Sequence, residues 1–174
     1  MYKFLKSLLK NEVDEYAEIN TDEVVYDENL LRNCKLNHCG KYNTSWMCPP
    51  SINQKELIRE FSLYKKAFVI SKITKLRDSF DVENLYKGRT KVEKILRNLR
   101  KIIENNYDYK LLGPGACGIC SKCTYPDAEC RFPELAIPGL EALGINVLEL
   151  AKSCNIKYYN GLNTVTYFAA IFHN

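Results

Sequence analysis

Four of the eight cysteines fall in one short segment, and their spacing limits the local fold more than any other feature of the chain. The run Cys117-Gly118-Ile119-Cys120-Ser121-Lys122-Cys123 is followed, after six further residues, by Cys130. Two residues between successive cysteines let their thiolates turn toward one centre, and a fourth, more distant cysteine can close a cage around it. The surrounding stretch 113–133 is dense in Gly, Pro and Cys, so it is predicted to be an irregular loop.

This spacing is typical of a thiolate metal site. It is close to the ferredoxin-type run that holds a [4Fe–4S] cluster, and thiolates are the soft ligands that iron–sulfur centres and zinc select. Structural zinc sites usually pair two hooks separated by a longer spacer, so three cysteines at consecutive short steps favour the cluster. We expect the cluster ligands to be Cys117, Cys120, Cys123 and Cys130. Zinc is the alternative, and a metal-free role is the third possibility.

A second group of cysteines precedes a proline pair in Cys34-x4-Cys39-x8-Cys48-Pro49-Pro50. Three thiolates leave one position of a metal site open. A non-protein ligand could fill it, as could one of three side chains: Cys130, Cys154 or His38. Cys154 lies in an apolar helical stretch, and a buried free thiol is the expected reading for it.

The seven candidate ligands can be divided in another way. In two-cluster ferredoxins the fourth cysteine of the run is followed by proline and ligates the other cluster. Here the cysteine that precedes proline is Cys48, which could complete the site of the 117–123 run, while Cys130 could join Cys34 and Cys39. The sequence does not choose between the two partitions. In either case we expect the two cysteine loops to meet in space.

The chain has 174 residues, which is enough to bury a core without disulfide bonds. Clustered cysteines in the reducing cytoplasm are more often metal ligands than disulfides. With no evident linker or internal repeat, we expect a single metal-binding domain over residues 1–174. Its two cysteine loops are expected at about 32–50 and 113–133.

The charge and hydropathy patterns limit the expected cellular location and the expected classes of binding partner. Residues 1–10 interleave apolar side chains with lysines and lack a small-residue cleavage site, which predicts a short amphipathic helix and no secretory signal. No apolar run approaches the ~20 residues of a membrane helix. The net charge of +4 is interspersed, and the most basic stretch, 90–101, has apolar residues at helical spacing. We expect a cytoplasmic protein with neither nucleic acid nor membrane as partner, and leave the oligomeric state open.

Strand-like and helix-like patterns alternate along the chain. Strands are expected at 16–20, 24–26, 67–73, 109–112 and 164–172, and helices at 53–64, 83–106, 135–143 and 147–154. The stretch 30–50 shows little periodicity and is predicted to be irregular. This order predicts an α+β fold, with an antiparallel or mixed sheet of about four strands, helices on one face, and two irregular cysteine-bearing loops.

An ordered series of motifs resembles a known family. The series is Cys39 with Tyr42, Trp46 and Cys48-Pro49-Pro50, then Gly113-Pro114 before Cys117-x2-Cys120-x2-Cys123, then Cys130-Arg131-x-Pro133, then Glu141-Ala142-x-Gly144-Ile145-x-Val147. It is similar to a bacterial and archaeal family of cysteine-rich predicted metal-binding proteins of unknown function, over about residues 32–150. The resemblance implies metal binding, expected as iron–sulfur, in anaerobe-type metabolism. The chain departs from the family at Tyr42-Asn43, where a Tyr-Gly pair is expected.

The expected function is therefore that of a metal-binding protein with one or two [4Fe–4S] clusters. It would transfer electrons or assist a larger redox enzyme, with a redox protein as partner. One alternative is an enzyme whose three-cysteine site leaves an iron open to substrate. Another is a zinc-stabilised interaction module. The chain has no P-loop, no G-x-G-x-x-G, no nucleophile elbow and no H-E-x-x-H, so the sequence leaves open whether it is an enzyme.

Overall fold

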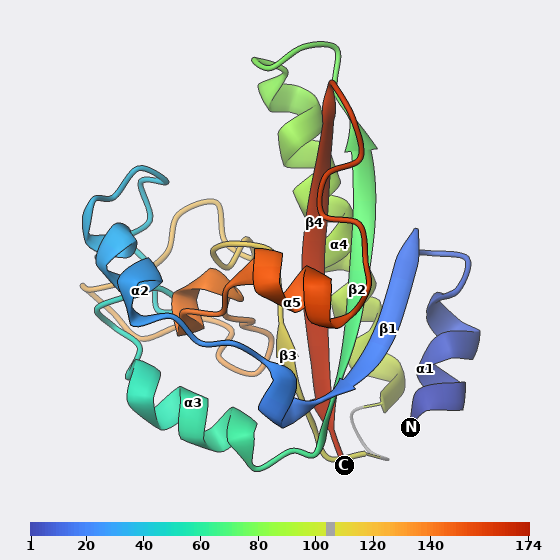
Figure 1. The fold of residues 1–174 in the computed structure, drawn as a ribbon. Coiled ribbons are helices and arrows are strands. Elements are labelled where there is room, and N and C mark those ends of the chain that lie inside the picture. The colour runs from blue at the N-terminus through green and yellow to red at the C-terminus, as the bar shows by residue number, and fades with distance from the viewer. Residues whose placement is uncertain (104–106) are drawn as a thin grey trace.

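A four-stranded antiparallel sheet forms the centre of the computed structural model, which describes residues 1–103 and 107–174 (Figure 1). Its strand order is β1-β2-β4-β3. The bounds are β1 Glu15–Asn20, β2 Lys66–Lys75, β4 Thr164–His173 and β3 Tyr109–Leu112. The predicted α+β class and the predicted sheet of about four strands are confirmed, with every pairing antiparallel.

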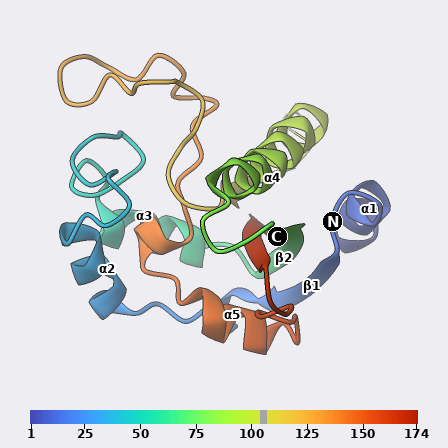
Figure 2. The same cartoon turned by 90° about the horizontal axis from the view of Figure 1, so that it is seen from above.

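Helices cover both faces of this sheet, whereas the sequence led us to expect them on one. Phe68 and Ile70 of β2 pack with α1 (Tyr2–Leu9) and α4 (Val82–Ile103). Ala67 and Val69, which alternate with them, pack with α3 (Gln54–Ser62) and α5 (Val147–Ser153) on the other face (Figure 2). Successive side chains of a strand point to opposite faces, so a strand that is apolar at every position needs cover on both.

Three further stretches differ from their predicted structure. The strand expected at 24–26 does not form, and only Tyr26 makes an isolated bridge, to Ile145. The expected irregular region 30–50 begins inside α2 (Glu28–Lys35), because the Asp27 side chain accepts a hydrogen bond from the Asn29 N–H and so caps a helix there. The expected helix 135–143 is reduced to the short 3₁₀ helix η2 (Glu141–Leu143). The last three residues of the predicted helix 83–106 lie outside the described residues.

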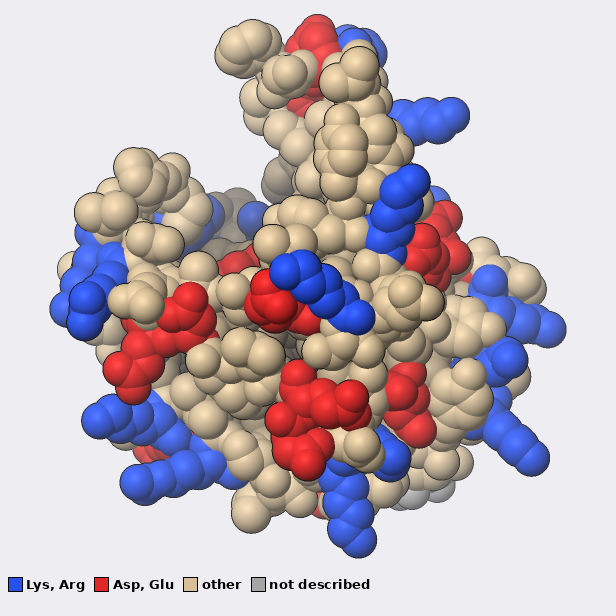
Figure 3. Space-filling view, in the orientation of Figure 1, with Lys and Arg blue, Asp and Glu red and all other residues tan. Residues whose placement is uncertain are grey.

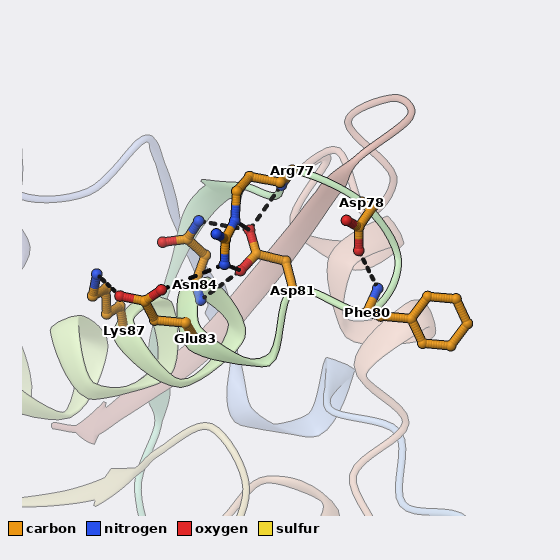
Figure 4. Close-up of polar contacts among 7 residues, drawn as sticks. All are labelled: Arg77, Asp78, Phe80, Asp81, Glu83, Asn84 and Lys87. Carbon is orange, nitrogen blue, oxygen red and sulfur yellow. Dashed lines mark hydrogen bonds and ion pairs between the residues drawn. The ribbon is translucent and has the colours of Figure 1, made fainter.

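The start of α4 is fixed by a buried carboxylate (Figure 4). Asp81 accepts hydrogen bonds from the backbone N–H and the guanidinium of Arg77 at 2.7–3.1 Å, and from the backbone and side-chain N–H groups of Asn84 at 3.3 and 2.7 Å. The Arg77 guanidinium is the main reason that the pKa of Asp81 lies well below its usual range. The orphan donors at the start of a helix are satisfied in this way.

Gly88 lets α4 lie directly against the sheet. A Cβ at this position would fall 2.3 Å from Thr74 Oγ1 and 2.7 Å from the Tyr167 ring, so only glycine fits. The Tyr167 hydroxyl also donates a hydrogen bond to the Leu85 carbonyl at 2.6 Å. The helix is therefore continuous through Gly88, and its middle turns are held in a fixed position beside the cysteine-bearing loops.

The surface charge is mixed. Lys and Arg side chains alternate with Asp and Glu over the face shown in Figure 3, and no single-sign patch dominates that face. None of the described helices combines the length and the apolar character needed to cross a membrane.

Candidate metal centre

The two cysteine-bearing loops lie side by side, as the sequence predicted. We call residues 32–50 the N-terminal cysteine segment and residues 113–133 the C-terminal cysteine segment (Figure 2). The Trp46 indole N–H donates a hydrogen bond to the Ala128 carbonyl at 3.1 Å. The Trp46 ring also meets the Tyr125 ring edge-on, with 4.9 Å between centroids. A single tryptophan thus fastens one segment to the other, and the predicted meeting of the loops is confirmed.

Four cysteines of the C-terminal cysteine segment line one small pocket. They are Cys117, Cys120, Cys123 and Cys130. The N-terminal cysteine segment contributes Ser45, Trp46 and Met47 to the same pocket. All four cysteines are partly exposed, and all eight cysteines of the chain are free thiols. The pocket therefore brings together soft donors that lie up to thirteen positions apart (130 minus 117) in the sequence.

The base of the C-terminal cysteine segment is tied down by backbone contacts. Gly113 donates to the Pro138 carbonyl at 2.9 Å and accepts from the Leu140 N–H at 3.1 Å. A Cβ at Gly139 would lie 2.3 Å from the Gly115 carbonyl oxygen, so the two chain stretches touch through backbone atoms. Residues 135–143, which were expected to form a helix, bond instead to the base of the C-terminal cysteine segment. These bonds explain why the backbone of residues 135–143 is irregular.

The Cys123 sulfur is surrounded by hydrogen-bond donors. Burial alone would raise its pKa, but the pKa of Cys123 is lowered, because donors from both segments stabilise the thiolate. These donors are the backbone N–H groups of Tyr125, Trp46 and Thr124 and the Ser45 hydroxyl. Hydrogen bonds of this kind hold and tune the thiolates of metal sites.

Cys117 faces the middle of α4. Burial is the main reason that its pKa is raised, the backbone N–H groups of Ile119 and Ile137 oppose that shift, and the charges of Glu93 and Cys130 add to it. Glu93 is itself held between Arg89, at 2.9 Å, and Arg97, at 3.7 Å. We call these three side chains of α4 the ion-pair ladder.

Gly118 rests on this ladder without any intervening side chain. A Cβ at position 118 would lie 2.6 Å from Glu93 Oε2 and 2.9 Å from Arg89 Nη2. The ladder carries two cations and one anion, and the anion Glu93 is the member whose charge acts on Cys117. Glycine at this position thus allows the cysteine run to approach charged groups that the sequence places about 25 residues away (118 minus 93).

The N-terminal cysteine segment brings its three cysteines close to one another. Cys34 lies in the last turn of α2, Cys39 is exposed and Cys48 is buried. Burial raises the pKa of the Cys48 thiol to about 11, and the charges of Cys39, Cys34 and Cys117 add to the rise while a Ser45 hydrogen bond opposes it. Burial also raises the pKa of Cys34, with contributions from Cys39 and Glu141.

The cysteines that influence one another's pKa can be compared with the two possible assignments of ligands. Cys130 acts on Cys117 and lines the pocket of the 117–123 run. Cys48 acts together with Cys34 and Cys39, and it also lies near Cys117. Cys48 therefore lies between the two groups.

Two other candidate ligands from the sequence are Cys154 and His38. Cys154 is buried at the end of α5, and burial raises its pKa to about 12, so it is the inert core thiol that the sequence suggested. His38 is exposed beside Cys39. His173, the last residue of β4, is buried and its ring contacts Glu18 at 3.0 Å.

The thiols of the described residues are not gathered around a single point. Among residues 1–103 and 107–174, no group of three or more His, Cys, Asp or Glu side chains is gathered so that it could hold a single metal ion. Four thiolates around one zinc ion lie about 2.3 Å from it and therefore about 3.8 Å from one another. Sulfurs that hold a cluster lie further apart, because several metal and sulfide atoms separate them.

Comparison with known families agrees with this donor set. The sequence profile of the family described as predicted metal-binding protein (DUF2284) matches residues 17–173. The chain belongs to this family. The family resemblance found in the sequence motifs is thereby confirmed, and the DUF2284 match covers both cysteine segments and all of the sheet except the first two residues of β1.

Other comparisons add little to the DUF2284 assignment. No significant match was found among curated proteins. A crystal structure of selenomethionine-labeled epoxyqueuosine reductase is similar with a TM-score of 0.42 and 10% identity, over 98% of this chain and 46% of that chain. The chain thus spans less than half the length of that protein. A similarity this low establishes neither a shared fold nor a shared activity.

Two residues of the DUF2284 site were not identified from the sequence. Ser45 lies within hydrogen-bonding reach of both Cys48 and Cys123, and Glu93 faces Cys117. The position of Ser45 three residues before Cys48 was a usable signal, because hydroxyls close to a ligand often bind its sulfur. Glu93 gave no such signal, since in the sequence it is one charge among many on an amphipathic helix.

Proposed function

We propose that the protein is an iron–sulfur protein whose main [4Fe–4S] cluster is held by Cys117, Cys120, Cys123 and Cys130. The observation that carries the proposal is the pocket lined by these four cysteines, together with the four donors aimed at the Cys123 sulfur. Four soft donors suit such a cluster, and N–H donors suit its thiolates. The donor set therefore fits the group, which would supply one-electron redox chemistry when bound.

We propose a second, smaller site at Cys34, Cys39 and Cys48. Its support is the closeness of the three thiols, since the charge of Cys39 acts on both Cys34 and Cys48, and the charge of Cys34 acts on Cys48. Three thiolates leave one position free, which a non-protein ligand or a neighbouring donor would occupy. Glu141 is such a neighbour, because its charge reaches Cys34. An enzyme whose substrate binds at that free position is the alternative function, and it rests on the same three cysteines.

Zinc is the weaker alternative for the main site. Structural zinc sites usually pair two hooks separated by a longer spacer, whereas Cys117, Cys120 and Cys123 follow one another at two consecutive short steps. The spacing of the cysteines in the sequence therefore favours a cluster. A zinc-stabilised interaction module would require the loops to contract around one ion.

The proposed role is electron transfer in the cytoplasm, either alone or as an accessory to a larger redox enzyme. The four cysteines of the main site are only partly buried, so a redox protein could approach the cluster closely. Glu93 would disfavour added negative charge at Cys117, and its ion pairs with Arg89 and Arg97 would weaken that effect.

Anaerobic purification with metal and sulfide analysis tests the proposal. The expected result is iron and acid-labile sulfide in equal amounts, with broad visible absorbance that bleaches on reduction. A reduced sample should give an electron paramagnetic resonance signal. Colourless protein that contains stoichiometric zinc and no iron, prepared without oxygen, would refute the cluster and support the zinc module. Samples purified in air are unsuitable, because oxidation of the thiols can remove the cluster.

A further inference from the structure

A cavity of about 710 Å³ lies next to the pocket of the four cysteines. Its walls come from α3 and the residues just before it, from β3, from the stretch 133–138, and from Trp46 and Met47. Ligand sites for small organic molecules usually measure about 300–1,000 Å³ and combine apolar walls with a few polar groups. The size and the mixed lining of this cavity therefore match a small organic ligand.

The cavity and the cysteine pocket share part of their walls. Trp46, Met47 and Ala136 line both. Trp46 is fixed on the cysteine side by its hydrogen bond to Ala128, and its backbone N–H donates to the Cys123 sulfur. A ligand in the cavity would therefore be separated from the cysteine site by the thickness of one side chain.

The charges in the cavity define the kind of ligand. The lining contains four carboxylates, Glu56, Glu60, Asp108 and Glu134, and two cations, Arg100 and Lys110. Lys110 is paired with Glu60 at 2.9 Å, and Arg100 donates a hydrogen bond to the Glu134 carbonyl.

Three carboxylates remain without a cation. Asp108 accepts a hydrogen bond from the Tyr64 hydroxyl at 2.7 Å, and neither it nor Glu56 or Glu134 forms an ion pair within the described residues. The lining therefore has a net negative charge. Aromatic side chains, Trp46, Phe61 and Tyr107, stand in the same walls. Aromatic faces and carboxylates both attract organic cations.

We infer that this cavity binds a small organic cation with an aromatic or apolar body, such as an amidine or a nitrogen heterocycle. Glu56 and Glu134 would supply the charge attraction, and Trp46 would supply an aromatic face. The inference rests on the cavity itself and goes beyond the proposed cluster. It adds a substrate-sized site that a simple electron carrier would not need.

Calorimetric titration with two probes of the same shape and opposite charge tests the inference. Benzamidinium and benzoate differ mainly in charge, so generic apolar binding affects both alike. At low salt, we expect benzamidinium to bind about tenfold more tightly than benzoate. The protein is used as purified without oxygen, and its iron content is determined in the same sample. A missing cluster would then appear as missing iron and not as missing binding.

Charge variants complete the test. The double variant Glu56→Gln with Glu134→Gln should lose most of the preference for benzamidinium, while the matched variant Glu12→Gln, an exposed acid that does not line this cavity, should keep it. Equal binding of the two probes, tighter binding of benzoate, or an equal loss in the Glu12→Gln variant would overturn the inference. A melting temperature for each variant, compared with the unaltered protein, separates lost binding from lost folding.

Discussion

The two cysteine segments differ in how the rest of the protein supports them. The C-terminal segment is clamped at its base by Gly113 and Gly139, and it lies on the ion-pair ladder of α4. The N-terminal segment leaves the short helix α2, exposes Cys39 and buries only Cys48. One segment therefore presents four partly exposed cysteines above a backbone clamp, while the other presents three cysteines that range from exposed to buried.

This difference suggests that the two proposed sites hold metal with different strength. Metal affinity depends on how well the ligands are preorganised as well as on their number. The main site has four thiolates and several donors aimed at them, so it should hold its cluster firmly. The smaller site has a free position and an exposed ligand, so it should exchange or lose metal more readily. A labile site with an open position is where a substrate or a partner would act.

Removal of a ligand from the main site should have the largest effect. We expect Cys120→Ala to abolish metal binding by the 117–130 group and so to remove most of the iron, measured by metal analysis of anaerobic protein. The matched control is Cys154→Ala, which removes a buried thiol that lies in the core cluster around α5. Iron loss in the control, or full iron content in the Cys120 variant, would contradict the assignment.

Removal of a ligand from the smaller site should have a smaller effect on iron content. Cys39 is exposed, so Cys39→Ala should leave the fold unchanged and remove only the metal of the N-terminal segment. The spectrum of the remaining cluster should be that of the unaltered protein. If Cys39→Ala removed as much iron as Cys120→Ala, the two segments would form one shared site and the comparison between them would fail.

Two alanine substitutions compare the supports of the C-terminal segment. Gly139→Ala would force a Cβ against the Gly115 backbone, which cannot move without the loop, and overpacking of this kind costs about 1–3 kcal/mol. Gly118→Ala meets only the ends of the Glu93 and Arg89 side chains, which can swing away, so its cost should stay below about 1 kcal/mol. Denaturant unfolding of both variants measures the difference. Equal costs would mean that the ladder is as rigid as the clamp.

The sequence predicted the sheet well because strand patterns are local. The apolar run 67–70 and the β-branched and aromatic run 164–172 both became strands that exceed their predicted ends. What the sequence reading missed was the second helical layer. The run 67–70 is apolar at each position, which is typical of a strand covered on both faces, and that signal could have been used.

The sequence named the cysteines of the proposed site but not the residues that surround them. Spacing alone identified the seven cysteines as candidate ligands, because a short separation in sequence limits the distance between two thiols whatever the fold. The helix expected at 135–143 failed because tertiary contacts override helix propensity, as the Pro138 carbonyl binds Gly113 instead. Glu93 and the wall shared through Trp46 depend on packing between segments far apart in the chain. No local pattern encodes such contacts.

A substitution at the start of α4 should affect stability without affecting metal. Asp81 lies about 18 Å along the helix axis from Glu93, twelve residues at about 1.5 Å each. Its side chain is fully buried and accepts five hydrogen bonds, so Asp81→Asn would leave donors of Arg77 and Asn84 unpaired and lower the melting temperature by several degrees.

The pH dependence of that variant gives the sharpest check. Because the pKa of Asp81 is lowered in the folded protein, its stabilising effect is complete above the ordinary carboxyl pKa and disappears as the pH falls through the lowered value. The gap in melting temperature between the unaltered protein and Asp81→Asn should therefore narrow in strong acid, as followed by circular dichroism. Iron content at neutral pH should be equal in the two proteins. A loss of iron in this variant would show that the cysteine segments depend on the whole length of α4. The comparison of the two segments would then have to include this distant end of the helix.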